Sequence, residues 1–357
     1  MTLILSNEDV SRLLTMPDCI TGLEIAYREL AEGRGVSRTR SDTYAPTSRD
    51  DALYCLKSMD GIAPHLGVGA VRINSDILTW PQDGGSTRRV KAPAAPNARY
   101  VGLVLLFSTE TGEPLAIFPD GVVQRLRVGA ANGLAVKYLA RADAKVAGLL
   151  GTGWQAGAQA MAAVAVRDIE VLRCYSPNQA RREAFATEMT TQLGIEVQPV
   201  KTPEAAVDGA DIVMCATNTI DPVFFAQWMA PGMHVSAVTR RELGRDVIDR
   251  ADRVFLHTPA ETPINTLSAG VVLPELEKGK GWRVTQAVDF AKLPLLTDLI
   301  AGRATGRATQ DEITCFINNL GLGYQFAVTG ALLYAKAKAT GAGRDLPTDW
   351  FTETEHP

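Results

Sequence analysis

The hydrophobic positions of the chain follow one rhythm near its start and another in its middle. Ser6 precedes a polar first turn and apolar positions that recur at helical spacing up to Leu14, and a second helix is predicted from about Pro17. Between residues 43 and 120 the apolar positions alternate or form short runs between turn clusters, which is typical of an antiparallel or mixed sheet. The predicted strands lie at 52–57, 68–73 and 100–107.

The middle of the chain alternates between strands and helices. A helix rich in small residues is predicted over 127–140, and strand–helix alternation then continues to about residue 298. Each apolar run is short enough for a strand that is buried on both faces of a parallel sheet. The predicted strands lie at 146–150, 169–175, 212–216, 234–238 and 254–256. This pattern indicates an α/β fold with a Rossmann-type, doubly wound parallel sheet.

The last apolar segment lies outside that alternation. Residues 311–338 are predicted as one long helix that is closed by Gly341 and Gly343. A helix this apolar needs cover on most sides, so we expect it to pack against the N-terminal sheet or in a subunit interface. A length of 357 residues also exceeds one ordinary core, which favours two domains.

The composition excludes several classes of function. A charged share of 21% and a formal net charge of −4 lack the basic excess that nucleic-acid binding requires. The five cysteines occur singly and without partners at metal spacing, so we expect reduced thiols and no metal site. The chain reaches acidic residues before any apolar run long enough for a signal peptide. The uncharged stretches 146–166 and 313–335 contain amide side chains that are costly in lipid, so we expect a cytoplasmic protein that does not cross a membrane.

A glycine-rich turn follows the first strand of the alternating region. Gly151 permits the sharp bend of a Rossmann turn, Gly153 lets the backbone approach a pyrophosphate, and Ala156 lets the helix pack on the strand. The alternative is a structural glycine turn without a ligand. Because the turn heads a series of strand–helix pairs, we predict a dinucleotide site that consists of Gly151, Thr152, Gly153, Trp154, Gln155 and Ala156.

The position that contacts the adenosine ribose lies near Ser176. No acid occurs in 174–182, whereas Ser176, Asn178, Arg181 and Arg182 offer groups that suit a 2′-phosphate, so NADP(H) is favoured over NAD(H). The alternative is that both arginines are solvated residues of the next helix. Two residues at the ends of later strands are also assigned to the cofactor site, namely Thr217 and Val238.

Nearly the whole chain resembles the ornithine cyclodeaminase/μ-crystallin family. The resemblance rests on the Gly151-Thr-Gly-x-Gln-Ala turn, Arg127-x-x-Ala-Ala, Arg241-Glu-Leu, and Asn319-Leu-Gly-Leu-Gly-x-Gln. It implies a Rossmann domain over 127–317. It also implies an α+β substrate-binding and dimerisation domain, formed by 1–126 with the C-terminal helix in 318–357, and a homodimer.

The resemblance further implies that the substrate is a small α-amino or α-imino acid. Arg40 and Arg127 fall where the family's carboxylate-binding arginines are expected, with Arg38 as an alternative to Arg40. Arg72 stands where the family usually has a lysine; it can hold charge but shuttles protons poorly. Lys57 is the candidate to take over that role, unless it faces solvent.

Departures from the family pattern decide the expected reaction. The loop 237–243 lacks the catalytic aspartate of the cyclodeaminases. Val128 replaces a threonine and Phe326 an aspartate, so we expect a less polar pocket. Two acids are possible replacements, although each is also explained as a turn cap or a surface charge: Asp76 and Glu242. Two histidines are expected to be structural core residues: His234 and His257.

Together these features predict an NAD(P)-dependent oxidoreductase, an imine or ketimine reductase that acts in reverse as an amino-acid dehydrogenase. One alternative is an ornithine- or lysine-type cyclodeaminase that recycles bound NAD. Another is a non-catalytic NADP(H)-binding protein that has lost its chemistry through the departures above.

Overall fold

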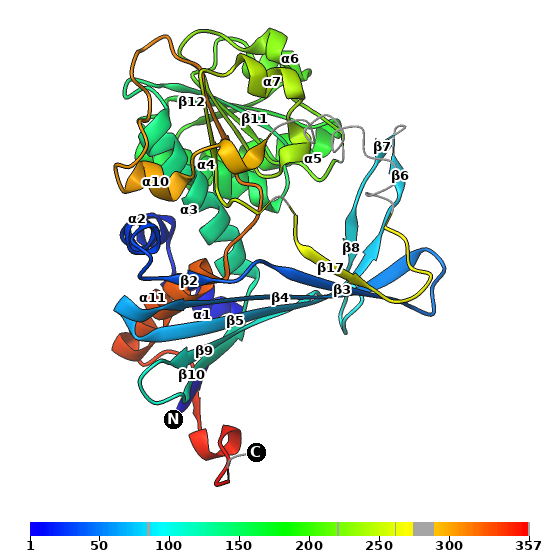
Figure 1. The fold of residues 1–357 in the computed structure, drawn as a ribbon. Helices are drawn as coiled ribbons and strands as arrows, with labels where there is room; N and C mark the ends of the chain where they lie inside the picture. The colour runs from blue at the N-terminus through cyan, green and yellow to red at the C-terminus, as the bar shows by residue number, and fades with distance from the viewer. Residues whose placement is uncertain (84–85, 220, 261, 274–288, 356–357) are drawn as a thin grey trace.

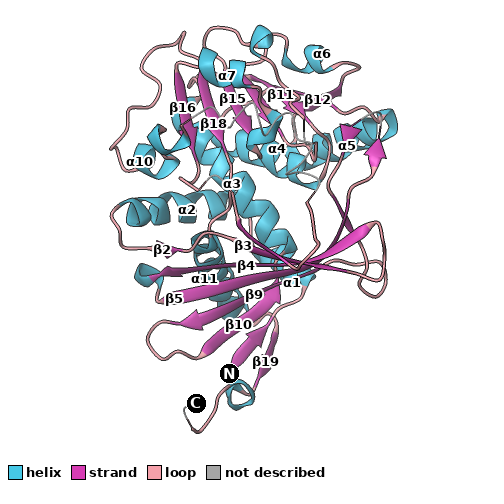
Figure 2. Ribbon diagram, turned by 45° about the vertical axis from the view of Figure 1, so that its right-hand side comes forward, coloured by secondary structure: helices cyan, strands magenta, loops and turns pink. Residues whose placement is uncertain are grey.

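Two β-sheets, with helices between them, organise the chain (Figure 1). The computed structural model describes residues 1–83, 86–219, 221–260, 262–273 and 289–355. Helices α2 (Met16–Ala31) and α3 (Gly121–Leu139) lie between the sheets in both views (Figures 1 and 2). Tyr27 of α2 belongs to the same hydrophobic core as Phe255 and Phe316 of the upper sheet. One continuous core therefore joins the two sheets.

Both predicted N-terminal helices are confirmed. Helix α1 (Asn7–Leu13) begins with a capping box between Ser6 and Asp9, and α2 begins with one between Thr15 and Asp18. Each box satisfies backbone N–H groups that the first helical turn leaves without partners.

Antiparallel strands form the centre of the ten-stranded sheet, as predicted. They are β3 (Ser41–Pro46), β4 (Ala52–Ala63), β5 (Val68–Thr79), β9 (Val101–Ser108) and β10 (Pro114–Pro119). Short strands complete it: β1 (Thr2–Ile4), β2 (Val36–Ser37), β8 (Val90–Ala92), β17 (Ile264–Leu267) and β19 (Arg344–Leu346). Strand β17 comes from the middle of the chain and pairs in parallel with β3, so the predicted alternation is interrupted before residue 298. A separate pair consists of β6 (Gln82–Asp83) and β7 (Ser86–Thr87).

The seven-stranded sheet is parallel throughout and confirms the predicted Rossmann-type fold. In spatial order its strands are β13 (Glu196–Pro199), β12 (Val171–Tyr175), β11 (Val146–Leu150), β14 (Ile212–Cys215), β15 (His234–Ala237), β18 (Thr314–Ile317) and β16 (Arg253–Leu256). The helices of this region are α4 (Trp154–Val166), α5 (Gln179–Leu193), α6 (Pro203–Val207), α7 (Arg245–Arg250) and α10 (Leu296–Ile300). Short 3-10 turns lie at Pro64–Leu66, Ala226–Trp228, Arg240–Glu242, Phe290–Lys292 and Thr348–Phe351.

Both faces of the seven-stranded sheet are covered. Ile212 and Met214 belong to a core that α4 and α5 share, whereas Val213 and Cys215 belong to one that α6 and α7 share. Alternate residues of β14 thus face opposite layers, as in a doubly wound sheet. No described helix combines the length and the hydrophobicity that a bilayer-spanning helix requires.

The prediction of a single helix over 311–338 is wrong. Residues 314–317 form β18, which lies between β15 and β16, and the helix α11 (Gly323–Thr340) begins only after it. Because β18 is buried on both faces, its apolar run has no period that distinguishes it from a buried helix. Helix α3 likewise begins six residues before its predicted start at 127, since it starts at Gly121.

Helix α11 packs on β4 and β5, as expected of an apolar C-terminal helix. Its first turn lies directly on β4: a Cβ atom at Gly61 would lie 2.2 Å from the Tyr324 nitrogen, and one at Gly323 would lie 2.1 Å from the Asp60 oxygen. Only glycine permits so close an approach of two backbones. This contact fixes the start of α11 on β4.

Candidate active site

The predicted phosphate turn joins β11 to α4. Gly151 has φ 115°, and a Cβ atom there would lie 2.3 Å from the Ala216 oxygen, so the position requires glycine. Gly153 is the N-cap of α4, and a Cβ atom there would meet nothing within 4 Å, which leaves the helix N-terminus open to a ligand. Ala156 is fully buried against the strands. The turn therefore fits the pyrophosphate of a dinucleotide.

The other residues of the turn face this opening or support it. Thr152 donates its hydroxyl to the Ser176 Oγ atom at 2.9 Å. Trp154 is 58% exposed, and the Arg125 guanidinium lies 3.8 Å from the centre of its ring. The Gln155 Oε1 atom is buried and has no hydrogen-bond partner within the described part of the chain, which is consistent with a ligand that donates to it.

The two candidate arginines after β12 have different environments. Asn178 caps α5 by accepting from the Arg181 backbone nitrogen at 2.9 Å, and the Arg181 side chain is exposed. Arg182 is buried and donates to the Ser176 carbonyl oxygen at 2.9 Å. Arg182 is thus a structural residue rather than a solvated one, and Arg181 is the cation that remains accessible to a ligand.

A buried carboxylate joins the ends of β14 and β15. The Glu242 side chain accepts from the Thr217 backbone nitrogen at 2.5 Å, from the Thr217 hydroxyl at 2.7 Å and from the Thr239 backbone nitrogen at 3.0 Å. Burial raises the pKa of Glu242 to about 7, although these donors act in the opposite direction. Val238 donates its backbone N–H to the Cys215 oxygen at 3.0 Å. Glu242 is therefore a turn cap, but a buried one that holds the predicted cofactor residues Thr217 and Val238 on neighbouring strand ends.

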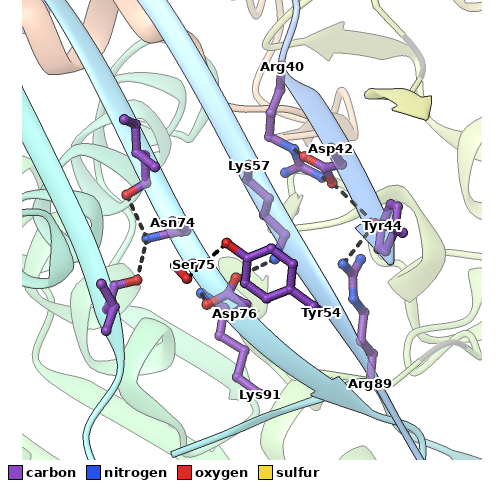
Figure 3. A network of polar contacts seen from close by, with 12 residues as sticks. Arg40, Asp42, Tyr44, Tyr54, Lys57, Asn74, Ser75, Asp76, Arg89 and Lys91 are labelled. Carbon is purple, nitrogen blue, oxygen red and sulfur yellow. Dashed lines mark hydrogen bonds and ion pairs between the residues drawn. The ribbon is translucent and has the colours of Figure 1, made fainter. Parts of the chain in front are cut away.

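The inner face of the ten-stranded sheet is apolar beneath α11 and charged beyond its N-terminus. Every second residue of β5 points to this face, which places Arg72, Asn74 and Asp76 together, and Lys57 of β4 is directly opposite Asn74. Asp42 of β3 is in turn opposite Lys57. Figure 3 shows Asp42, Lys57, Asn74 and Asp76 side by side on these neighbouring strands. We call the set Arg40, Asp42, Lys57, Arg72, Asn74, Asp76, Asp120 and Arg127 the charged patch.

Lys57 and Arg40 each have an acidic partner in the charged patch. The Lys57 Nζ atom lies 2.5 Å from the Asp76 carboxylate, to which the Lys91 Nζ atom also binds at 3.0 Å. Burial, together with the charges of Arg89 and Lys91, lowers the pKa of Lys57 to about 8. Arg40 makes two bonds of 2.9 Å to the buried Asp42. Neither Lys57 nor Asp76 faces solvent, so for both the alternative of a surface charge is wrong.

Arg72 is held firmly by acceptors. It donates to Asp120 at 2.7 Å and also to Asn74 and Gln124. Burial lowers its pKa, and the Asp120 carboxylate opposes that shift. With three acceptors around one guanidinium, Arg72 supplies fixed positive charge, as expected of an arginine in a lysine position.

Arg127 differs from the other three cations because it has no carboxylate partner among the described residues. It is buried, donates from Nη1 to the Gln325 Oε1 atom at 3.0 Å, and has no partner for Nε in the described chain. Burial and the charge of Arg72 lower its pKa to about 9. The Phe326 ring lies 5.0 Å from the Arg127 guanidinium carbon and 5.5 Å from that of Arg72. Phe326, where the resemblance implied an aspartate, thus lies beside both guanidinium groups and neutralises neither.

A chain of hydrogen bonds holds the partner of Arg127. Gln325 donates from Nε2 to the Tyr27 hydroxyl at 2.8 Å, and Tyr27 bonds to His257 Nε2 at 2.7 Å. The His257 Nδ1 atom is 2.5 Å from the Leu320 carbonyl oxygen, so it must donate and Nε2 must accept. Burial lowers the pKa of His257 to about 4, which agrees with a neutral ring. His257 is therefore structural, as predicted.

His234 is also a core residue, as predicted. It is fully buried within β15, its Nδ1 atom lies 2.9 Å from the Thr314 hydroxyl, and burial lowers its pKa to about 3. Arg38, the alternative to Arg40, is 65% exposed and pairs with Asp60 at 2.7 Å. Arg40, which is 23% exposed beside the buried Asp42, is the better placed of the two.

Sequence reasoning missed several members of this site. Asp42 and Asp120 were not singled out, and neither were Tyr27 and Lys91. The sequence does indicate part of the patch. Arg72, Asn74 and Asp76 stand at every second position of an otherwise apolar strand, a pattern that indicates a functional sheet face. The pairing of Asp42 and Asp120 with arginines depends on contacts between distant segments, which a single sequence does not display.

Comparison with known proteins places the chain among enzymes of one family. A family model described as the ornithine cyclodeaminase/mu-crystallin family matches residues 1–341. A Delta(1)-pyrroline-2-carboxylate reductase of Bacillus cereus is 29% identical over 349 residues, which are 96% of this chain and 99% of the relative. An alanine dehydrogenase of Archaeoglobus fulgidus is 27% identical over 354 residues, which are 97% of this chain and 98% of the relative.

A solved structure supports the same relationship. The Delta(1)-pyrroline-2-carboxylate reductase of Thermococcus litoralis, in complex with NADH and L-proline, has a TM-score of 0.77 and 28% identity, and the match covers 97% of this chain and 100% of that one. The predicted family is thereby confirmed, and the chain belongs to the ornithine cyclodeaminase/mu-crystallin family.

Proposed function

We propose that the protein is an NAD(P)-dependent oxidoreductase that interconverts a small α-imino acid and the corresponding α-amino acid. The observation that carries this proposal is the buried Arg127, whose hydrogen-bond acceptor among the described residues is a neutral amide. A buried cation is costly without an anion. In the charged patch Arg40, Lys57 and Arg72 each have an acid and Arg127 has none, which leaves one positive charge for one substrate carboxylate.

Different residues of the charged patch bind the substrate carboxylate and transfer the proton. Arg127, with Arg40, binds the carboxylate and thereby orients the α carbon. A nicotinamide dinucleotide at the Gly151–Ala156 turn supplies or accepts the hydride. Lys57, with a pKa of about 8, donates a proton to the substrate nitrogen in reduction, and the neutral lysine takes that proton back from the substrate nitrogen in oxidation.

The loop after β15 favours reduction over cyclodeamination. Its only carboxylate is Glu242, which is buried and occupied by the donors of Thr217 and Thr239. Cyclodeamination needs an acid that can reach the side-chain nitrogen of a diamino acid, and no other acid occurs in residues 237–243.

For the cofactor we propose NADP(H). The exposed Arg181, the Ser176 hydroxyl and the absence of acids from residues 174–182 suit a 2′-phosphate.

For the assembly we propose a homodimer in which 1–126 and 318–357 form the substrate-binding and dimerisation domain. The face of the ten-stranded sheet opposite α11 exposes large apolar side chains, which a second copy would cover. They include Leu56, Ile62, Val101 and Leu103.

An assay with defined substrates tests the reaction. Purified protein is incubated with NADPH or NADH and with Δ1-pyrroline-2-carboxylate, or with pyruvate plus methylamine, and the loss of reduced nicotinamide absorbance is followed. Turnover is the expected result. Release of ammonia from ornithine or lysine without a net absorbance change would select a cyclodeaminase instead, and tight cofactor binding without turnover on any substrate would select a non-catalytic binding protein.

A further inference from the structure

A cavity of about 500 Å³ lies between the two sheets. Residues 258–260, which follow β16, and residues 320–322, which follow β18, line it from the carboxyl edge of the seven-stranded sheet. Residues 35–40, around β2 and the start of β3, line it from the other sheet, while α2 and α10 close it. Figure 2 shows β2 and α2 below the ends of β16 and β18. Ligands of open α/β sheets bind at this edge.

The cavity adjoins the carboxylate site. Arg40 is one of its lining residues. Gly321 is another, and a Cβ atom on Gly321 would lie 2.3 Å from the Arg127 Nη1 atom, so the Gly321 backbone lies against that guanidinium group. A ligand whose carboxylate is held by Arg40 and Arg127 therefore has this cavity beside its α carbon.

The walls of the cavity suit an apolar substituent. Leu30, Val36, Leu295, Leu320 and Leu322 contribute to them. The ionisable groups in the walls have partners of their own: His257 is fixed in a neutral form by Tyr27 and Leu320, and Arg38 pairs with Asp60. The Asp298 carboxylate accepts from the Leu295 backbone nitrogen at 3.4 Å. Among the residues that the structure describes, each ionisable side chain on the side of the cavity away from Arg40 therefore has a hydrogen-bond or ion-pair partner.

The volume indicates a large substituent. Ligand pockets of roughly 300–1,000 Å³ enclose drug-sized molecules. A cavity of about 500 Å³ is thus much larger than a methyl group or a five-membered ring requires.

We propose that this cavity binds the side chain of the substrate, and that the preferred substrates are α-imino acids with a branched aliphatic or aromatic side chain. This inference rests on the proposed function, since it assumes that Arg40 and Arg127 hold the carboxylate.

A substrate series tests the proposal. The enzyme with NADPH or NADH is assayed with methylamine and one of three 2-oxo acids: pyruvate, 4-methyl-2-oxopentanoate and phenylpyruvate. Each oxo acid condenses with the amine to an imine and water, and the hydride of the cofactor reduces that imine. We expect kcat/KM to be at least about tenfold higher for the two bulky acids than for pyruvate, in the range that hydrophobic pockets reach.

A cavity-filling variant tests whether the preference for bulky substrates arises in this cavity. Val36 lines the cavity and is 56% exposed, so Val36→Trp adds bulk there without disturbing a packed core. It should lower kcat/KM for the bulky acids by about tenfold or more and change that for pyruvate by less than about twofold. The control Ile25→Trp changes an exposed residue of α2 outside the cavity and should leave all three values unchanged.

The possible results distinguish a wrong assignment of the cavity from a wrong proposed function. Turnover of pyruvate with no gain for the bulky acids, or an equal loss for all substrates in Val36→Trp, would overturn the cavity assignment and leave the proposed function intact. No turnover of any imine, pyrroline-2-carboxylate included, would overturn the proposed function. In that case amino acids are titrated onto the cofactor-loaded protein, and tighter binding of leucine and phenylalanine than of alanine is still expected if the cavity binds side chains.

Discussion

The phosphate turn and the charged patch are built in opposite ways. The turn is a run of six consecutive residues between β11 and α4, and its geometry follows from local requirements such as the positive φ of Gly151. The patch collects side chains from β3, β4, β5 and α3 and from the residues just before β3 and α3, and its ion pairs join these segments. The cofactor class is therefore encoded in one local segment, whereas the proposed reaction depends on which buried cation lacks a carboxylate partner among the described residues.

The largest expected effect comes from removing that charge. Arg127→Met should lower kcat/KM by about a thousandfold, since loss of one member of a buried charged pair costs about 2–5 kcal/mol. The melting temperature should be unchanged or higher, because a buried guanidinium without an acid is replaced by an apolar side chain of similar length. Steady-state kinetics and calorimetry measure the two quantities.

The partly exposed Arg245, whose ion-pair partner in the described part of the chain is Asp249, provides the matched control Arg245→Met, with no expected change in kcat/KM. A large fall in melting temperature for Arg127→Met, parallel to the loss of activity, would mean that Arg127 is structural and that the comparison between turn and patch is mistaken.

The second effect concerns the proton. Lys57→Met should lower kcat/KM at least about a hundredfold, as general acids contribute about 10²–10⁴. In the wild type, reduction requires protonated Lys57, so its rate should fall as the pH rises through about 8, whereas oxidation should rise over the same range. Lys57→Arg keeps the charge but does not titrate there, so its pH profile should be flat around 8. An unchanged profile in either variant would assign the proton to another group.

The sequence predicted the turn better than the patch for physical reasons. Gly151, Gly153 and Ala156 were identified because backbone geometry dictates those residue types in one short segment. Arg72 was identified by position, but its three acceptors were not, since Asp120 and Gln124 reach it from another element. The strand β18 was predicted as helix because a strand buried on both faces loses the alternation that marks strands.

A third and smaller expected effect concerns the buried Glu242 and the pH dependence of the free energy of unfolding. The folded protein keeps the Glu242 proton up to about pH 7, whereas an unfolded glutamate releases it near its ordinary pKa of 4.5. Between these values the folded state binds more protons, so Glu242 makes the free energy of unfolding fall as the pH rises. Glu242→Gln should remove about 2 kcal/mol of that decrease between pH 5 and 7.

Denaturant unfolding at several pH values measures this effect. The buried histidines act in the opposite direction below pH 6.5, because their folded pKa values are lowered to about 3 and 4. Only the difference between wild type and Glu242→Gln therefore isolates the carboxylate. If that difference does not change with pH, the Glu242 carboxylate is ionised throughout and its donors outweigh its burial.

The smallest expected effect concerns the choice between NADPH and NADH. Arg181 is exposed and its backbone, not its side chain, is used in the cap of α5, so Arg181→Ala should leave the fold intact. If its guanidinium binds a 2′-phosphate, the variant should raise the KM for NADPH about tenfold, as expected for one charged hydrogen bond of about 1.5 kcal/mol, and leave the KM for NADH unchanged.

The neighbouring exposed residue Gln179 provides the control Gln179→Ala. Equal effects on both cofactors would make Arg181 a solvated helix residue, and a wild type that prefers NADH would show that the absence of an acid near Ser176 does not by itself select the phosphorylated cofactor. In either case the phosphate turn would keep its proposed role, because a Rossmann turn binds the pyrophosphate, which both cofactors share.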